Sequence, residues 1–210
     1  MSDLVKPYLI GITGGSGSGK TSFLGELKKM FPDHQLSVLS QDNYYVLRQD
    51  QPVDDKGVQN FDTPNSINQA EFIRDVRRLK EGQSVFRKEY TYNNPKATPK
   101  DLEFRPAPVI VIEGIFVFYL KEVAELLDLK IFIEAENYLM LKRRVIRDGK
   151  ERGYDTDDVL YRFEKHVMPT FKNYIQPFRE KADIIIPNNK NFTIGLEVLA
   201  GFIRSKVQKT

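Results

Sequence analysis

A glycine-rich segment between two regular elements constrains this chain more than any other feature. Residues 14–21 fit the pattern G-x-x-x-x-G-K-[ST]. They follow an apolar run, 8–13, that predicts a buried strand, and they open a predicted helix over 18–31 that ends before Pro32. A strand, a tight loop and a helix in this order predict the first unit of a parallel α/β sheet.

The residues of this loop are suited to holding phosphate groups. Glycines allow the backbone N–H groups to turn inward, and the start of the following helix adds partial positive charge. Lys20 is expected to reach the β- and γ-phosphates, and the Thr21 hydroxyl is expected to hold Mg²⁺. ATP is the expected nucleotide, with GTP as the alternative. The predicted nucleotide site comprises Gly14, Gly15, Ser16, Gly17, Ser18, Gly19, Lys20, Thr21 and Ser22. A flexible loop that fits by chance is disfavoured by the flanking elements.

Strands and helices alternate along the rest of the chain. Further strands are predicted at 36–39, 108–112, 129–133 and 184–186, and further helices at 66–80, 138–147, 155–171 and 192–207. This order predicts a P-loop NTPase three-layer α/β/α fold with a parallel central sheet, a small lid and a projecting β-hairpin region. We expect one kinase domain over 1–210, with the lid at about 144–156 and an acceptor-side insertion at about 41–104.

Composition and charge exclude several classes of protein. There is no cysteine, so disulfides and thiolate metal sites are excluded, and the two histidines, His34 and His166, are far apart in the sequence. The formal net charge of +3 is not gathered into a basic run, which suits an anionic small molecule better than nucleic acid. Residues 1–7 lack a signal-peptide pattern, and the longest apolar run, 109–120, is too short to cross a bilayer. We therefore expect a cytoplasmic protein with no membrane partner.

A GTP-binding switch is a weak alternative. Such proteins need a D-x-x-G at a strand end and an N-K-x-D segment that reads the base. The D-x-x-G of this chain, Asp54 to Gly57, lies in a polar loop, and the segment 189–192 lacks the final Asp.

Two carboxylates follow predicted strands, at the edge of a parallel sheet where ligands bind. Asp42 comes just after 36–39 and is placed to accept the proton of a hydroxyl that attacks the γ-phosphate. Glu113 comes directly after the predicted strand 108–112. A buried carboxylate favours a nearby cation, for which Mg²⁺ is the natural candidate. A turn-forming Asp42 and a Glu113 that reaches solvent remain open as alternatives. The combination predicts an ATP-dependent phosphotransferase with an alcohol acceptor.

The order of motifs resembles the uridine kinase branch of the phosphoribulokinase/uridine kinase family. The resemblance extends over about 8–188, nearly the whole chain. The matching pieces are 14–22, 40–45, Asn60-Phe61-Asp62-x-Pro64, Tyr90, 113–115, Arg143-Arg144-x-x-Arg147-Asp148, Glu151-Arg152-Gly153 and 182–187.

The resemblance implies catalytic and metal-binding roles for several positions. Asp42 is implied as the general base for a 5′-hydroxyl and as a residue that also faces the metal. Glu113 is implied as a carboxylate on the Mg²⁺ side, with Thr21. Arg147 and Arg152 are implied to stabilise phosphate charge from a mobile lid, together with Lys20.

The resemblance also implies an acceptor site. Asp62 would hydrogen-bond the ribose hydroxyls, Tyr45 and Tyr90 would line the nucleoside site, and Arg144 would help to hold the acceptor. From the residues alone, Asp62 could instead form a helix-entry turn, and the tyrosines could be ordinary half-buried aromatics. Arg144 and Arg147 are three residues apart and project from one side of a helix. Lys142, Arg143 and Lys150 are expected to be solvated.

Three positions depart from the family pattern. Pro95 stands where a histidine usually follows Tyr90, Tyr154 replaces an arginine of the lid, and Arg162 replaces a glutamine. All three fall on the acceptor and lid sides, so the acceptor is less constrained than the nucleotide. The acceptor that the resemblance implies is a pyrimidine nucleoside, which would be uridine, with cytidine as a further acceptor. A different nucleoside or small-molecule hydroxyl remains an alternative, as does a nucleotide-gated regulatory protein without an acceptor. We also expect a homo-oligomer.

Overall fold

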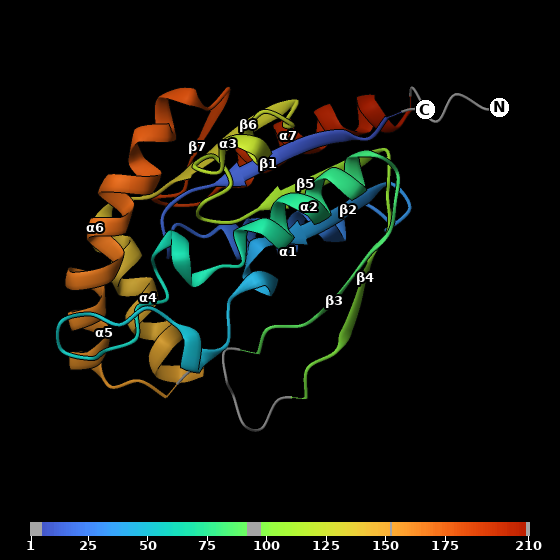
Figure 1. Ribbon diagram of the computed structural model, residues 1–210. Helices are drawn as coiled ribbons and strands as arrows, with labels where there is room; N and C mark the ends of the chain where they lie inside the picture. Colours follow the sequence, from blue (N-terminus) through green and yellow to red (C-terminus); the bar gives the residue numbers. More distant parts are fainter. Residues whose placement is uncertain (1–5, 92–97, 152, 209–210) are drawn as a thin grey trace.

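The centre of the protein is a parallel sheet of five strands in the order β2-β5-β1-β6-β7 (Figure 1). The computed structural model describes residues 6–91, 98–151 and 153–208. The strands are β1 Tyr8–Thr13, β2 Leu36–Ser40, β5 Val109–Glu113, β6 Leu129–Glu134 and β7 Ile184–Pro187. Every residue of β5 is buried, because β5 lies between two strands and both of its faces are covered.

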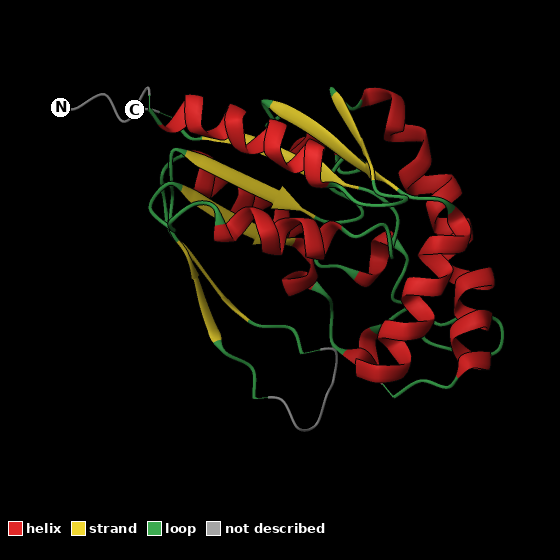
Figure 2. Ribbon diagram, turned by 180° about the vertical axis from the view of Figure 1, so that it is seen from behind, coloured by secondary structure: helices red, strands yellow, loops and turns green. Residues whose placement is uncertain are grey.

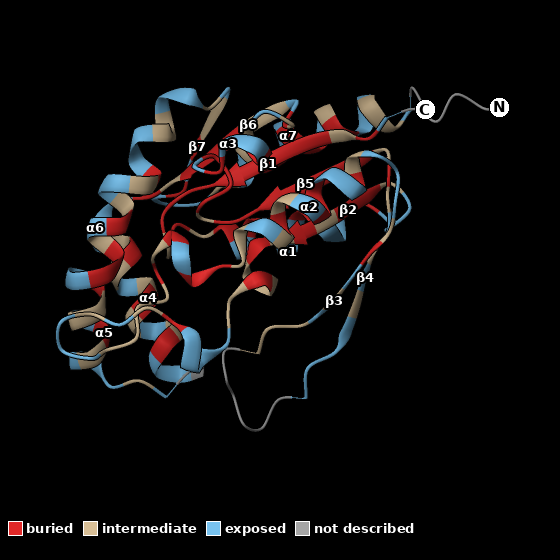
Figure 3. Cartoon of the chain, viewed as in Figure 1, coloured by how far each residue is buried: buried red, intermediate tan, exposed pale blue. Residues whose placement is uncertain are grey.

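Helices cover the two faces of the sheet. On one face lie α1 (Lys20–Lys29) and α7 (Thr193–Val207), and on the other lie α2 (Gln69–Lys80) and the short α3 (Lys121–Ala124) (Figure 2). Successive side chains of a strand point to opposite faces of the sheet. Leu9 therefore packs in the hydrophobic core between the sheet and α2, and Ile10 packs in the core between the sheet and helices α1 and α7. The sheet and the inner sides of these helices are buried (Figure 3), which confirms the three-layer α/β/α fold.

Helix α2 begins at Gln69, three residues later than the sequence pattern predicts. Pro64–Ser66 forms a 3₁₀ turn, and the Asn68 side chain caps the helix by accepting a hydrogen bond from the Glu71 amide at 3.2 Å. The polar segment before it contains two further 3₁₀ turns, at Gln41–Tyr44 and Arg48–Asp50.

Beyond the carboxyl edge of the sheet, two helical segments pack side by side. Helix α4 (Asn137–Glu151) runs beside an arm that starts with α5 (Thr156–Arg162), capped by Asp155 (Figure 1). The arm continues through a π-helical turn (Phe163–Val167), α6 (Met168–Thr170), a second π turn (Phe171–Ile175) and a 3₁₀ turn to Lys181. It is therefore ten residues longer than predicted. Pro169 lacks an N–H and crowds the preceding turn, which explains why wider turns flank it.

A two-stranded hairpin projects from the body of the protein (Figures 1 and 2). It consists of β3 (Val85–Lys88) and β4 (Asp101–Phe104), which pair antiparallel with Val85 opposite Phe104. This confirms the predicted hairpin region. Among the helices of residues 6–91, 98–151 and 153–208, none combines the length and the hydropathy of a membrane span.

The packing of α2 on the sheet can be tested at Phe72, which is fully buried against Tyr44, with the two ring centroids 4.9 Å apart. We expect Phe72→Ala to lower the free energy of unfolding by about 3–5 kcal/mol, because a cavity replaces the ring. Urea denaturation measures this. Arg77→Ala, at an exposed position of the same helix, should change stability by less than about 0.5 kcal/mol; equal effects of the two variants would contradict this packing.

Candidate active site

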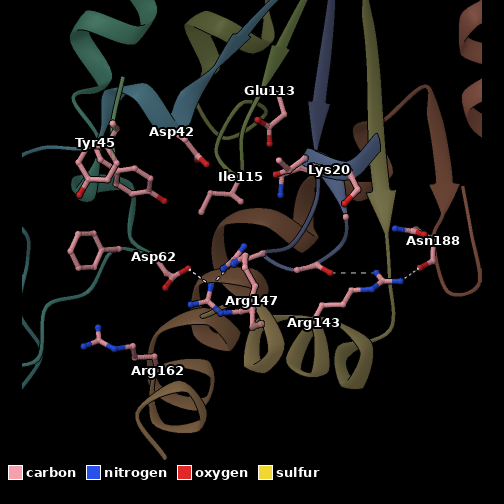
Figure 4. Close-up of a pocket in the computed structure, with 18 of the residues that line it drawn as sticks. Lys20, Asp42, Tyr45, Asp62, Glu113, Ile115, Arg143, Arg147, Arg162 and Asn188 are labelled. Atoms are coloured by element: carbon pink, nitrogen blue, oxygen red, sulfur yellow. Dashed lines mark hydrogen bonds and ion pairs between the residues drawn. The ribbon is translucent and has the colours of Figure 1, made fainter. Parts of the chain in front are cut away.

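A cavity of about 560 Å³ opens at the carboxyl edge of the sheet (Figure 4). It collects most of the residues that the sequence indicates, from the phosphate loop, the ends of β2 and β5, the 41–62 segment and α4. Those that line it are Ser16, Gly17, Gly19, Lys20, Thr21, Ser22, Asp42, Tyr45, Asp62, Tyr90, Glu113, Arg144 and Arg147. Gly14, Gly15 and Ser18 belong to the loop without lining the cavity, and Arg152 lies outside the described residues.

The phosphate loop has the tight conformation that its glycines allow. Gly17 has a φ of 86°, and a Cβ atom there would lie 2.6 Å from the Met140 carbonyl oxygen, so only glycine fits. Lys20 bridges the loop, since its Nζ donates to the carbonyl oxygens of Gly14 at 2.9 Å and Gly15 at 3.2 Å. Burial lowers the pKa of Lys20, while the nearby carboxylates of Glu113 and Asp42 act in the opposite direction.

Two carboxylates lie near Lys20 in this cavity, Asp42 and Glu113 (Figure 4). Burial, and secondly the charge of Asp42, raises the pKa of Glu113 to about 7, although Lys20 and a hydrogen bond from Ser40 oppose the rise. The Ser40 hydroxyl donates to Glu113 Oε2 at 2.9 Å and also accepts from the Asp42 amide at 3.3 Å. The last residue of β2 therefore positions both acids.

These residues fit a magnesium ion. Glu113, Asp42 and the Thr21 hydroxyl offer only oxygen donors, which Mg²⁺ prefers, and the buried Glu113 carboxylate would be stabilised by a cation. Within the described ranges, no group of three or more His, Cys, Asp or Glu side chains could hold a metal by itself. Phosphate oxygens and water would then complete the coordination, as is usual for Mg²⁺ beside a nucleotide.

An aromatic wall and an ion pair also line the cavity. The ring centroids of Tyr45 and Tyr90 lie 5.2 Å apart. Phe61 packs edge-on against Tyr45, with a distance of 6.2 Å between the ring centroids. Arg144 Nη1 lies 3.3 Å from Asp62 Oδ1 and donates to the Ser16 hydroxyl at 2.6 Å. Asp62 and Arg144 are thus held together beside the phosphate loop.

Asp148 orients two arginines of α4. One of its carboxylate oxygens lies 3.4 Å from Arg144 Nε, and the other accepts from Arg147 Nε at 2.8 Å. Asp148 is only 2% exposed, so its charge is compensated by these two guanidinium groups. Arg144 and Arg147 both enter the cavity, as their spacing of three residues predicts.

Among the described residues, five that line the cavity were neither predicted as site residues from the sequence nor named as departures from the family pattern: Phe61, Ile115, Arg143, Asn188 and Phe192. For Arg143 the prediction of a solvated side chain is wrong, because the guanidinium is partly buried against the phosphate loop and Asn188. Its spacing of four from Arg147 on the same helix is the signal that could have found it. Asn188 follows β7 at the carboxyl edge, but its residue type carries no signal of its own.

Two of the three positions that depart from the family pattern also line the cavity, Tyr154 and Arg162. The Arg162 guanidinium lies over the Tyr154 ring at 5.0 Å, donates from Nη1 to the Gln59 carbonyl at 2.7 Å, and is held by Asp158 at 3.1 Å. Arg162 therefore places a cation on the same side of the cavity as Tyr45 and Asp62 (Figure 4). Pro95 lies outside the described residues.

Asp54, which opens the D-x-x-G segment, does not line the cavity. It accepts hydrogen bonds from Tyr161 at 2.7 Å and from the amides of Lys56 and Val58, and it lies 2.8 Å from Nε2 of the buried His166. Desolvation acts to raise the pKa of Asp54, but these hydrogen bonds outweigh it and hold the pKa well below its usual range. Asp54 therefore joins the 53–59 turn to the helical arm, which is a structural role.

Comparison with known proteins identifies the family. The model of the Phosphoribulokinase / Uridine kinase family matches residues 9–194. The chain belongs to this family. It is 33% identical over 201 residues to a uridine kinase from Staphylococcus aureus (strain JH9), covering 96% of this chain and 97% of that protein. The resemblance to the uridine kinase branch is thereby confirmed.

Solved structures share the fold. Phosphoribulokinase from Rhodobacter spheroides aligns with a TM-score of 0.60 at 17% identity, over 87% of this chain and 70% of its own. D-glycerate 3-kinase from Cryptococcus neoformans var. grubii aligns with a TM-score of 0.58 at 14% identity, over 89% and 88%. The names of these proteins differ in the molecule that is phosphorylated, so the fold alone does not select an acceptor.

Family membership makes this protein an ATP-dependent small-molecule kinase, as the phosphate loop and the acid groups predict. This disfavours both the GTP-binding switch and the regulatory protein without an acceptor. The roles of the individual site residues remain predictions.

The raised pKa of Glu113 predicts a pH dependence of stability in the protein without nucleotide and metal. Its pKa is about 7 in the folded protein and 4.5 as a free side chain, so the folded state binds more protons between these values. Stability from this group is therefore present below about pH 4.5 and is lost as the pH rises through 7. The free energy of unfolding of wild type minus that of Glu113→Gln should fall by about 2–3 kcal/mol from pH 4.5 to 7.5.

Urea denaturation in EDTA at several pH values measures this difference, in which the other titrating groups largely cancel. A difference that stays constant or rises with pH would contradict the burial of Glu113.

Proposed function

We propose that this kinase transfers the γ-phosphoryl group of ATP to the 5′-hydroxyl of a pyrimidine nucleoside, with uridine as the main acceptor and cytidine as a second one. The observation that carries the proposal is the presence of Asp42 and Asp62 in one cavity with the phosphate loop. Asp42 lies near Lys20, and Asp62 lies farther out beside the aromatic wall (Figure 4). The similarity to a uridine kinase over nearly the whole chain supports the same acceptor.

In this proposal Asp42 is the general base. Its carboxylate accepts the proton of the acceptor hydroxyl while that oxygen attacks the γ-phosphorus in line with the leaving ADP. Lys20 and Arg147 offset the charge on the phosphoryl oxygens, and Arg152 is proposed to do the same from the lid. Thr21, Glu113 and Asp42 would hold Mg²⁺, which would supply further charge neutralisation when bound. Closure of the 144–156 segment would exclude water as a competing acceptor.

Asp62 and the aromatic wall would bind the nucleoside. A carboxylate accepts hydrogen bonds from two neighbouring hydroxyls, which suits a ribose, and the ion pair with Arg144 fixes the direction of the Asp62 carboxylate. Tyr45, Tyr90 and Phe61 offer flat apolar surface for a base. Together these contacts would place the 5′-hydroxyl on the Asp42 side.

Arg162 favours a second candidate, a kinase of the same family with another acceptor. Its guanidinium carries only donors and a positive charge, so an acceptor that presents anionic oxygens to this wall would gain more from it than a neutral pyrimidine nucleoside does. A phosphorylated sugar has such oxygens.

A coupled assay of ADP release separates the two candidates. Uridine and cytidine should stimulate ADP release well above the rate without acceptor, and more than purine nucleosides, pantothenate or phosphorylated sugars do. Stimulation by one of the other compounds alone would replace the proposed acceptor, and an absence of stimulation by all of them would leave only the nucleotide half of the proposal standing.

The role of Asp42 generates a mutational prediction. Asp42→Asn keeps the shape of the side chain but removes the proton acceptor, so acceptor-stimulated turnover should fall by roughly 10²–10⁴-fold. ATP affinity, measured by calorimetry, should change less than about threefold, because the phosphate contacts come from the loop. Asp50→Asn, at an exposed position of the same segment, is the control and should keep full activity. Full activity of Asp42→Asn would remove this residue from the mechanism.

A further inference from the structure

We propose that Arg143 and Asn188 are positioning residues that hold the phosphate loop in its triphosphate-binding conformation through its carbonyl groups. The inference concerns the nucleotide half of the reaction, so it does not depend on which acceptor is used. It starts from a group of hydrogen bonds that neither the motif nor the proposed chemistry requires.

The bonds converge on two carbonyl groups of the loop. Arg143 Nη1 donates to the carbonyl oxygens of Gly17 at 3.4 Å and Ser18 at 3.2 Å, and its Nη2 donates to the Asn188 carbonyl at 2.7 Å. The Asn188 side chain donates from Nδ2 to the same Ser18 oxygen at 2.8 Å. Side chains from α4 and from the end of β7 thus meet on one peptide group (Figure 4).

The direction of this peptide group decides how the loop binds phosphate. In a trans peptide the C=O and N–H bonds point in opposite directions. Donors that hold the Ser18 oxygen therefore direct the Gly19 N–H the other way, at the point where α1 begins. A hydrogen bond to the oxygen also polarises the peptide and strengthens the N–H as a donor. Amides at a helix start are the groups that bind phosphate oxygens.

Asn188 is rigidly placed for this role. Asn188 is 5% exposed, and its backbone N–H donates to the Glu134 carbonyl oxygen at 2.7 Å, which joins it to the end of β6. A Cβ atom on Gly19 would lie 2.2 Å from Asn188 Nδ2, and Gly19 has a φ of 100°. The glycine at position 19 thus leaves the space that the Asn188 amide occupies.

Arg143 supplies donors in two directions at once. Its planar guanidinium reaches the loop with one nitrogen and Asn188 with the other, which a lysine ammonium is poorly shaped to do. Within the described part of the chain, no carboxylate forms an ion pair with Arg143, and the guanidinium is held by carbonyl oxygens. The arrangement therefore depends on the shape of the guanidinium as well as on its charge.

Nucleotide binding by purified variants tests the proposal. Arg143→Ala and Asn188→Ala should each weaken binding of a non-hydrolysable ATP analogue about three- to tenfold, and Arg143→Lys should resemble Arg143→Ala. Inorganic tripolyphosphate, used as a competitor of ATP, should lose affinity by a similar factor, because it uses the loop but has no base. The KM for ATP should rise while the KM for the acceptor stays within about twofold of wild type.

Two matched controls lie next to these residues. Lys142 is exposed on the same helix, and Asn189 is exposed on the same loop, where it contacts Glu136 at 3.2 Å. Lys142→Ala and Asn189→Ala should bind the nucleotide as the wild type does.

Hydrogen exchange in the nucleotide-free protein gives a second readout that needs no ligand. Peptides covering 14–24 should exchange faster in Arg143→Ala and Asn188→Ala than in the controls. Unchanged exchange and unchanged affinity would overturn the proposal. A loss confined to ATP, with tripolyphosphate unaffected, would instead assign the two residues to the nucleotide base and would overturn it as well. Wild-type affinity in Arg143→Lys would show that charge alone matters, which contradicts positioning by shape.

Discussion

The phosphate loop can bind a triphosphate only if its amides point into the cavity, and the rest of the site is arranged around that requirement. The loop conformation is maintained by side chains that bind its carbonyl groups. Lys20 bridges the carbonyl groups of Gly14 and Gly15, while Arg143 and Asn188 hold those of Gly17 and Ser18. These side chains come from the start of α1, from α4 and from the end of β7, so the loop is stabilised by elements that lie far apart in the chain.

Charges in the cavity are paired before a ligand arrives. Glu113 and Asp42 act on Lys20, Asp148 holds Arg144 and Arg147, and Asp158 holds Arg162. Such pairing fixes the direction of each cation, so little reorganisation is needed when phosphate charge enters the site. Burial disfavours the charged form of Glu113 and raises its pKa, so a cation beside it would be stabilising.

The acceptor side is connected to the helical arm as well as to the sheet. Arg162 donates to the Gln59 carbonyl, and Tyr161 donates to Asp54, so the turn that precedes Asp62 is joined to the arm at two points. Arg162 and Tyr154, which differ from the family pattern, lie at this junction. Changes of acceptor within the family could therefore arise here without any change to the nucleotide side.

Much of the fold follows from local pattern. The five strands of the central sheet were predicted to within about one residue at each end, because continuous apolar runs bounded by glycine or polar residues are strong signals. The helical arm was predicted to end at about Phe171, whereas a second π turn and a 3₁₀ turn continue it to Lys181. The start of α2 differs because the cap at Asn68 and the turn before it compete with helix formation at residue 66.

The sequence by itself determined the phosphate loop, the acids at the ends of β2 and β5, and the family, because each depends on residues that are adjacent in the chain or ordered along it. Only the tertiary structure decided that Arg143 faces the loop, that Asn188 meets the Ser18 carbonyl, and that Asp62 pairs with Arg144. Those contacts join residues that are 82 to 170 positions apart. Local pattern contains no information about such pairs, since the packing of α4 and β7 around the carboxyl edge of the sheet brings them together.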